Sequence, residues 1–265
     1  MRKIRSLRSA DGPDYDHYHY YDNDHHHHYY HDNYNYNYHN DDYHYKYEQY
    51  DKQYDKHYVD VTNMETSDKR TYRNYVGGNY LMNGFWQLEK LVSQGLFSRH
   101  RVLDIGCGSL RAGRYIAMYV NKGNYHGVEP NMWLVEGALK QDLGEDWLKL
   151  HRVTISDSEH FEASLNRRFN YVLANSIATH APRKMVEELM QKIASQMEST
   201  GVAFLTYNDS SSDYQGNDWK YPGAVGYRFK TMKSIAESCG LEVTSKEPSK
   251  ANSVQTWLVL KRIKT

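Results

Sequence analysis

The chain has 265 residues, a length typical of one large domain or two small ones, and its 33 basic side chains balance 33 acidic ones. No apolar run is long enough to cross a membrane, and no apolar segment follows the basic first residues as in a secretory signal. Two cysteines make neither a disulfide framework nor a four-ligand zinc site. We therefore expect a cytoplasmic protein without a membrane partner.

Residues 14–58 form a low-complexity tract that differs sharply from the rest of the chain. The tract consists of 15 Tyr, 10 His, 9 Asp, 5 Asn, 3 Lys, 2 Gln and 1 Glu. Without aliphatic side chains it cannot bury enough surface to offset the entropy of ordering, so residues 1–63 are predicted to be a disordered tail and linker. Residues 64–265 are predicted to form the folded domain.

Three interpretations of the tract stay open. All of its amino acids have adenine as the second base of their codons, so a trinucleotide repeat would produce it without any role for the protein. The run His25–His28 favours transition-metal binding, and the Tyr/Asn alternation favours self-association. A non-catalytic metal-binding or adhesive protein is therefore one alternative for the function.

Helical and strand patterns alternate from residue 81 onward. Leu81, Phe85, Leu88, Leu91 and Val92 recur at the spacing of an amphipathic helix. The predicted helices cover residues 81–92, 110–120, 132–140, 182–197 and 232–240. The predicted strands cover residues 101–105, 125–128, 150–155, 171–174, 202–207, 241–244 and 254–260.

The order of these elements predicts the fold class. Five strands alternate with helices, as in a doubly wound parallel sheet. The polar link between the last two strands is too short for a crossover helix, so these strands must pair as an antiparallel hairpin. The sequence therefore predicts an α/β fold with a mostly parallel seven-stranded sheet and helices on both faces.

The first chemical signal is the glycine-rich turn after the first predicted strand. The strand ends in Asp104, and Gly106 and Gly108 allow the main chain to approach a ligand closely. A helix expected from Ser109 would direct free N–H groups to the same crevice. Glu129 ends the next strand, where a carboxylate can accept both hydroxyls of a ribose. This arrangement predicts a nucleoside-containing cofactor.

Two classes of enzyme fit such a cofactor. A nicotinamide oxidoreductase stays open as an alternative, although Arg111 replaces the third glycine of the dinucleotide fingerprint and no Tyr-x-x-x-Lys pair is evident. The segments DIGCG, GVEP and FNYVLANS resemble instead the motifs that follow the first, second and fourth strands of class I S-adenosylmethionine-dependent methyltransferases. Leu110 stands where that family often has a further glycine.

The resemblance covers residues 81–262 and implies methyl transfer with S-adenosylmethionine as cofactor. The residues that it assigns are Asp104, Gly106 and Gly108 for the methionine half, Glu129 for the ribose, Asp157 for the adenine amino group, and Asn175 for the methionine and substrate. Asp157 also suits the N-cap of a helix. Arg111 and Arg114 are expected on the surface of the first helix, with the cofactor carboxylate as an alternative partner for either.

The acceptor side is predicted from residues that follow the fourth and fifth strands. His180 is the candidate catalytic base because histidine titrates near neutral pH; bracing the loop before Pro182 is the alternative. The candidate substrate-binding residues are Asp209 at the end of the fifth strand and Tyr214, Trp219 and Tyr221 in the loop that follows. The chain has no basic stripe and no Asn/Asp-Pro-Pro-aromatic motif, which favours a small-molecule acceptor over a nucleic acid.

Overall fold

The computed structural model describes residues 71–77, 79–250 and 254–264. The predictions of disorder, metal binding and self-association for the tract, and the boundary at residue 63, concern residues outside these ranges. None of the described helices has the length and apolar character needed to cross a membrane. The cytoplasmic setting stays a prediction.

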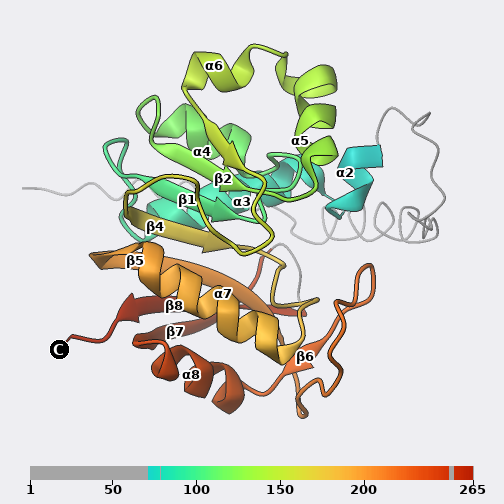
Figure 1. Cartoon of the computed structure of the whole chain (residues 1–265), viewed down its shortest axis with the longest axis vertical. Coiled ribbons are helices and arrows are strands. Elements are labelled where there is room, and N and C mark those ends of the chain that lie inside the picture. Colours follow the sequence, from blue (N-terminus) through green and yellow to red (C-terminus); the bar gives the residue numbers. More distant parts are fainter. Residues whose placement is uncertain (1–70, 78, 251–253, 265) are drawn as a thin grey trace, which may run out of the picture. The chain divides into compact units, whose positions relative to one another are not determined.

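One mixed sheet organises the described residues (Figure 1), with the strand order β3-β2-β1-β4-β5-β8-β7 and β6 paired to β5. The strands are β1 Val102–Ile105, β2 Tyr125–Val128, β3 Thr154–Ser156, β4 Phe169–Ala174, β5 Met197–Asp209, β6 Gly226–Tyr227, β7 Leu241–Pro248 and β8 Gln255–Arg262. Strands β1 to β5 are parallel, whereas β8 runs antiparallel to both β5 and β7. The parallel sheet and its terminal hairpin are confirmed, and the two-residue β6 is an addition.

Helices cover both faces of the sheet, as predicted. They are α2 Thr71–Tyr75, α3 Tyr80–Ser93, α4 Gly113–Tyr119, α5 Met132–Ala138, the π-helix η2 Leu139–Leu143, α6 Trp147–His151, α7 Arg183–Gln196 and α8 Phe229–Ser238. Helices α7 and α8 pack on the face of Leu103 and Val172, whereas α3 and α4 pack on the face of Val102 and Leu173 (Figure 1). Successive strand residues thus face opposite layers, which explains why these strands are apolar throughout.

The apolar stripe of α3 is only partly buried. Leu81 and Phe85 are each 48% exposed, while Gly84 and Leu91 are buried. A Cβ atom on Gly84 would lie 2.1 Å from the carbonyl oxygen of Arg111. Because glycine allows this contact between two main chains, the helix turns its glycine face inward and leaves part of its apolar stripe in solvent.

Several predicted boundaries are wrong, and two of them affect the glycine turn and the core. The helix expected from Ser109 begins at Gly113, because Leu110 has a φ of 57° and its side chain is fully buried in the turn. The strand expected over residues 150–155 starts only at Thr154, because α6 occupies its first part and places Trp147 in the core. A short apolar run of this kind is compatible with either a strand or a helix.

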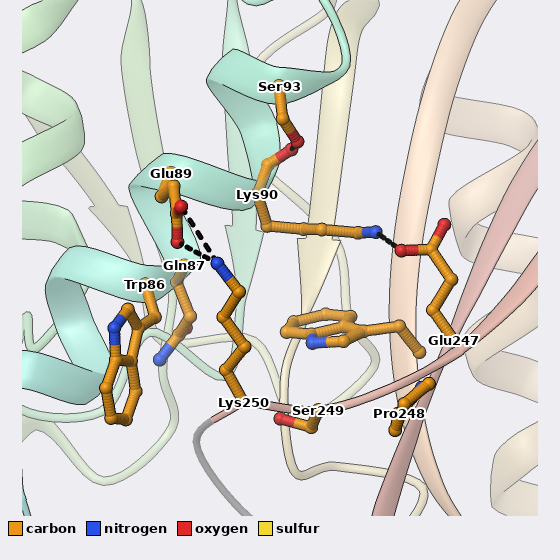
Figure 2. Close-up of a pocket in the computed structure, with 10 residues that line it drawn as sticks. Trp86, Gln87, Glu89, Lys90, Ser93, Glu247, Pro248, Ser249 and Lys250 are labelled. Atoms are coloured by element: carbon orange, nitrogen blue, oxygen red, sulfur yellow. Dashed lines mark hydrogen bonds and ion pairs between the residues drawn. The ribbon is translucent and has the colours of Figure 1, made fainter. Parts of the chain in front are cut away.

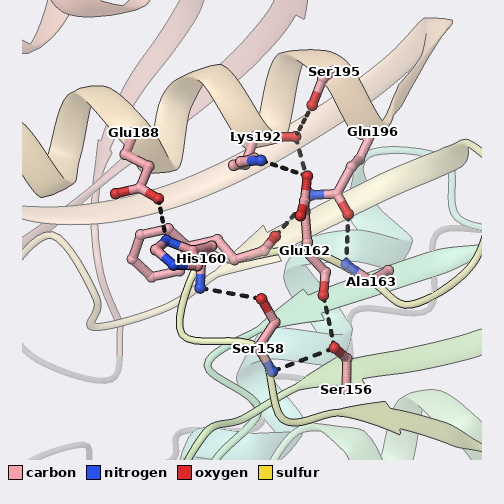
Figure 3. A network of polar contacts seen from close by, with 10 residues as sticks. Ser156, Ser158, His160, Glu162, Ala163, Glu188, Lys192, Ser195 and Gln196 are labelled. Carbon is pink, nitrogen blue, oxygen red and sulfur yellow. Dashed lines mark hydrogen bonds and ion pairs between the residues drawn. The ribbon is translucent and has the colours of Figure 1, made fainter.

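The link between β3 and β4 contains no helix in the structure and is held by side chains of α7 (Figure 3). The amide of Ala163 donates to Oε1 of Gln196 at 2.7 Å, and Nε2 of Gln196 donates to the carbonyl of Phe161 at 2.8 Å. His160 pairs with Glu188 at 2.9 Å. These contacts fix the segment that follows the carboxyl end of β3.

Candidate active site

The glycine turn after β1 lies at the carboxyl edge of the sheet. Gly106 and Gly108 have φ values of 71° and 54°, which favour glycine. A Cβ atom on Gly106 would lie 2.2 Å from Cδ1 of Ile177, and one on Gly108 would lie 2.9 Å from Cγ1 of Val76. Other groups can therefore approach the main chain of the turn closely only because both positions lack side chains.

Glu129 follows β2 and its carboxylate points back to this turn. The residue is 5% exposed, and its two oxygens accept hydrogen bonds from the amides of Gly108 at 2.9 Å and Asn131 at 2.8 Å. Burial raises the pKa of Glu129, and the two amides oppose this shift. A carboxylate oxygen has two acceptor sites, so each oxygen keeps one for a hydroxyl. The arrangement fits the two hydroxyls of a ribose.

Asp104 lies inside the sheet beneath the turn. It is 3% exposed, and Oδ2 accepts a hydrogen bond of 2.8 Å from the Tyr125 hydroxyl. Burial raises the pKa of Asp104 to about 7, whereas Tyr125 and the charge of Arg111 lower it. The carboxyl group therefore changes its charge near neutral pH and responds to a charged ligand.

The expectation that Arg111 and Arg114 lie on a helix surface is wrong. Arg114 is 7% exposed and donates to the Tyr80 hydroxyl at 2.7 Å and to Asp142 at 3.0 Å. Arg111 is partly buried in the turn before α4, and its Nη1 donates to the carbonyl of Val76 at 2.6 Å. Arg111 turns inward because the chain between Gly108 and Gly113 is a turn and not the first part of a helix, whereas Arg114 lies in the first turn of α4 on the side that faces Tyr80.

A row of aromatic rings, here called the aromatic row, connects α2 and α5 with the loop of residues 213–227. Its members in order are Trp133, Tyr75, Tyr221, His180 and Trp219, and their successive ring centroids are 5.1, 4.8, 5.0 and 5.5 Å apart. Burial and the charge of Glu129 raise the pKa of Tyr75. The row therefore passes close to the ribose-binding candidate. Tyr75 and Trp133 were not predicted, although an aromatic residue soon after the GVEP motif was a usable signal.

His180 braces the predicted acceptor loop and keeps one ring nitrogen for chemistry. Its Nδ1 atom lies 2.7 Å from the carbonyl oxygen of Gly223 and 3.1 Å from that of Lys220. Carbonyl oxygens only accept hydrogen bonds, so Nδ1 carries a proton, and in the neutral ring the lone pair is on Nε2. The bracing role and the base role are therefore compatible in one tautomer.

Asn175 directly follows β4 and remains partly exposed at the sheet edge. Its Nδ2 donates to Oγ of Ser176 at 3.2 Å, and Thr206 donates to its Oδ1 at 3.5 Å. Gln255 of β8 in turn donates to Oγ of Ser176 at 3.0 Å. This network fixes Asn175 beside Ile177, the residue that covers the glycine turn.

The two remaining aspartates lie at the edges of the site. Asp157 is exposed and follows Ser156, whose carbonyl accepts the amide of Glu129 at 2.8 Å; no helix follows it, so the N-cap alternative is wrong. Asp209 is exposed and pairs with Lys246 of β7 at 2.5 Å, which holds the pKa of its carboxyl group low. Their roles toward adenine and substrate stay predictions.

The acceptor loop is anchored at its first residue. Asp213 accepts hydrogen bonds from the amide of Arg228 at 2.8 Å and from Thr231 at 2.9 Å, and it also pairs with the Arg228 guanidinium. The Tyr214 hydroxyl donates to the carbonyl of Asp218 at 3.2 Å, inside the loop. Trp219, in contrast, is 43% exposed and presents its ring beside His180.

A separate hollow of about 160 Å³ lies between α3 and the β7–β8 hairpin (Figure 2). Two ion pairs cross it: Lys250 with Glu89 at 2.9 Å, and Lys90 with Glu247. These pairs connect the helix to the hairpin. In the part of the chain that the structure describes, no group of three or more His, Cys, Asp or Glu side chains is placed to hold a metal ion.

Comparisons with known proteins agree with this geometry. Residues 82–246 match the model of the family described as a methyltransferase domain. The match spans more than half of the chain, so the chain belongs to this family. With its Rossmann-like sheet and terminal hairpin it is a class I methyltransferase that depends on S-adenosylmethionine. A search among curated protein sequences gave no match.

Solved methyltransferases share the fold at low sequence identity. The glycopeptide N-methyltransferase MtfA, in complex with S-adenosyl-L-homocysteine, is 12% identical with a TM-score of 0.53, over 68% of this chain and 90% of its own. The mitomycin 7-O-methyltransferase MmcR is 15% identical with a TM-score of 0.54, over 71% of this chain and 55% of its own. The CcbJ methyltransferase from Streptomyces caelestis is 13% identical with a TM-score of 0.54, over 74% of this chain and 95% of its own.

Proposed function

We propose that this protein transfers the methyl group of S-adenosylmethionine to a small-molecule acceptor by direct displacement. Where the acceptor must lose a proton, His180 is the base. Two observations carry the proposal: the Glu129 carboxylate is oriented so that it can accept ribose hydroxyls, and Nδ1 of His180 donates to main-chain carbonyls, which leaves Nε2 as the basic nitrogen of the neutral ring. The aromatic row joins the two across the same edge of the sheet.

The geometry of the turn supports the proposed cofactor residues. Glu129 accepts the ribose hydroxyls, and Gly106 and Gly108 let the main chain meet the methionine half. Asp104 and Asn175 flank that half, and Asp157 directly follows β3, the strand paired with β2, so that it can reach the adenine amino group. When bound, S-adenosylmethionine supplies a methyl group activated by a sulfonium.

The chain's own contribution to the reaction is orientation and proton removal. Trp219 and Tyr221 contact His180 and offer flat faces to an acceptor, while Tyr214 supports the loop and Asp209 lines its edge. Holding the acceptor in line with the methyl carbon supplies most of the rate in such a displacement. His180 takes the acceptor proton on Nε2 and holds its own proton on Nδ1.

The test is methyl transfer from labelled S-adenosylmethionine to the separated small-molecule, protein and nucleic-acid fractions of a cell extract. We expect label only in the small-molecule fraction, and none with Glu129→Ala. As a matched control, Glu136→Ala removes an exposed carboxylate from α5 and should leave the transfer unchanged. Label in the protein or nucleic-acid fraction would contradict a small-molecule acceptor.

A further inference from the structure

Three arginines surround the glycine turn, and only two of them have a counter-charge. Arg73 of α2 and Arg114 of α4 both pair with the same carboxylate, that of Asp142 in η2. Their guanidinium groups also lie 5.0 and 4.8 Å from the centre of the Tyr80 ring. Arg111 forms no ion pair with any residue that the structure describes.

The position of Arg111 is fixed by its main chain and by one side-chain contact. Its carbonyl oxygen packs against Gly84 of α3, and its Nη1 donates to the carbonyl of Val76 at 2.6 Å. A guanidinium has five N–H donors and keeps its charge in proteins. Within the described ranges the protein uses one of these donors, which leaves a charged, partly buried group with hydrogen-bonding capacity.

A buried charge is costly unless an opposite charge neutralises it. Removal from water lowers the pKa of Arg111, and the nearby Asp104, Tyr80 and Tyr221 oppose the shift. Asp104 is the carboxylate whose charge acts on Arg111, yet Arg111 and Asp104 form no ion pair. The turn therefore has the charge pattern of a site whose anion comes with the ligand.

The side chain is also in the right place for one part of the cofactor. Arg111 follows Gly108 by three residues, and its charge acts on Asp104, which lies beneath the methionine half. The methionine half carries a carboxylate, which a planar guanidinium can bind with two parallel hydrogen bonds. We propose that Arg111 binds the methionine carboxylate of S-adenosylmethionine, an inference that rests on the proposed cofactor site.

The experiment compares two ligands that differ only in this carboxylate. S-adenosylmethionine and its decarboxylated form are titrated calorimetrically into the full chain and into Arg111→Met. We expect Arg111→Met to weaken S-adenosylmethionine binding by about 10- to 100-fold, the range of a charge-assisted hydrogen bond, and to leave the decarboxylated form within about twofold. Arg111→Lys should restore part of the lost affinity, because lysine keeps the positive charge but cannot donate two parallel hydrogen bonds.

Arg114→Met is the matched control. It removes the same charge a few residues away, but its partner is Asp142 of the chain itself. We expect a lower thermal stability and an equal change in affinity for both ligands. An equal loss for both ligands with Arg111→Met would overturn the inference while leaving the cofactor site intact. If the unmodified chain binds neither ligand, both the inference and the proposed function are wrong. Should Arg111→Met fail to fold, the test uses Arg111→Lys and compares its affinity for S-adenosylmethionine with its affinity for the decarboxylated form.

Discussion

The backbone amide of Gly108 donates a hydrogen bond of 2.9 Å to Oε2 of Glu129. This contact joins the turn after β1 to the residue that follows β2, so one carboxylate both shapes the glycine turn and faces the proposed ribose site. A second amide, that of Asn131, binds the other oxygen at 2.8 Å. The side chain is therefore oriented before any ligand arrives, and little of the cofactor's binding energy is needed to place it.

Gly84→Ala should destabilise the domain although alanine is the better helix former. In an exposed helix the change gains about 1 kcal/mol. Here the new Cβ would lie 2.1 Å from the backbone carbonyl of Arg111, so α3 must move away from the turn. We expect a loss of about 2–3 kcal/mol in the free energy of unfolding, measured with urea. Met82→Ala, at a position 40% exposed on the same helix, should change it by less than about 1 kcal/mol. A more stable Gly84→Ala would refute the packing argument.

Asp104→Asn should stabilise the protein without ligand at high pH. Burial raises the pKa of Asp104 from 3.8 to about 7, so its contribution to stability is full below the unfolded value and is lost as pH rises through 7. Asparagine keeps an acceptor for Tyr125 and has no charge to bury. We expect a gain of at most about 4 kcal/mol in the free energy of unfolding near pH 8 and almost none near pH 4.

Urea unfolding of both forms at the two pH values measures this difference. The same substitution should weaken S-adenosylmethionine binding, because the methionine ammonium loses a counter-charge. A stability difference that does not depend on pH would show that the Asp104 carboxyl group ionises normally.

His180→Asn should separate catalysis from loop bracing. The asparagine amide can donate to the carbonyl of Gly223, as Nδ1 of His180 does at 2.7 Å, but it offers no base. We expect the methyl-transfer rate to fall by about 100-fold or more, with S-adenosylhomocysteine affinity within about twofold. Rates come from labelled transfer and affinities from calorimetry. An unchanged rate would assign His180 to bracing alone.

Asp213→Asn should loosen the acceptor loop. Hydrogen bonds from Arg228 are the main cause that holds the pKa of Asp213 at about 2, well below its ordinary value. The stabilisation is therefore present above about pH 4 and is lost as pH falls toward 2. We expect faster proteolytic cleavage within residues 213–227 at neutral pH. Asp218→Asn, at an exposed position of the same loop, is the control and should be cleaved at the rate of the unmodified chain.

The sheet could be predicted from the sequence because its strands are buried on both faces. Val102, Leu103 and Ile105 are all fully buried, and such continuous apolar runs mark parallel strands directly. The short link before β8 likewise required an antiparallel hairpin. The glycine turn and Glu129 followed from their order along these strands.

What the sequence did not show depends on contacts between distant residues. The inward face of α3 is set by Gly84 against Arg111, not by the apolar stripe of Leu81 and Phe85. The left-handed Leu110 delays the start of α4 and so turns Arg111 into the site. No local periodicity records such contacts.

The aromatic row was also not predicted, because it too depends on contacts between residues far apart in the sequence. Tyr75 and Tyr221 are separated by most of the domain in sequence, yet their rings lie 4.8 Å apart. Only the folded sheet, which brings the end of α2 and the loop after β5 to one edge, places them together.

The most direct test of the cofactor site is a calorimetric titration of S-adenosylhomocysteine into the unmodified chain, Glu129→Ala and Glu136→Ala. The site geometry predicts equal binding for the unmodified chain and Glu136→Ala, and a loss of about 100-fold or more for Glu129→Ala, since two hydrogen bonds to a charged group disappear. Undiminished binding by Glu129→Ala would contradict the assignment of the ribose to this carboxylate.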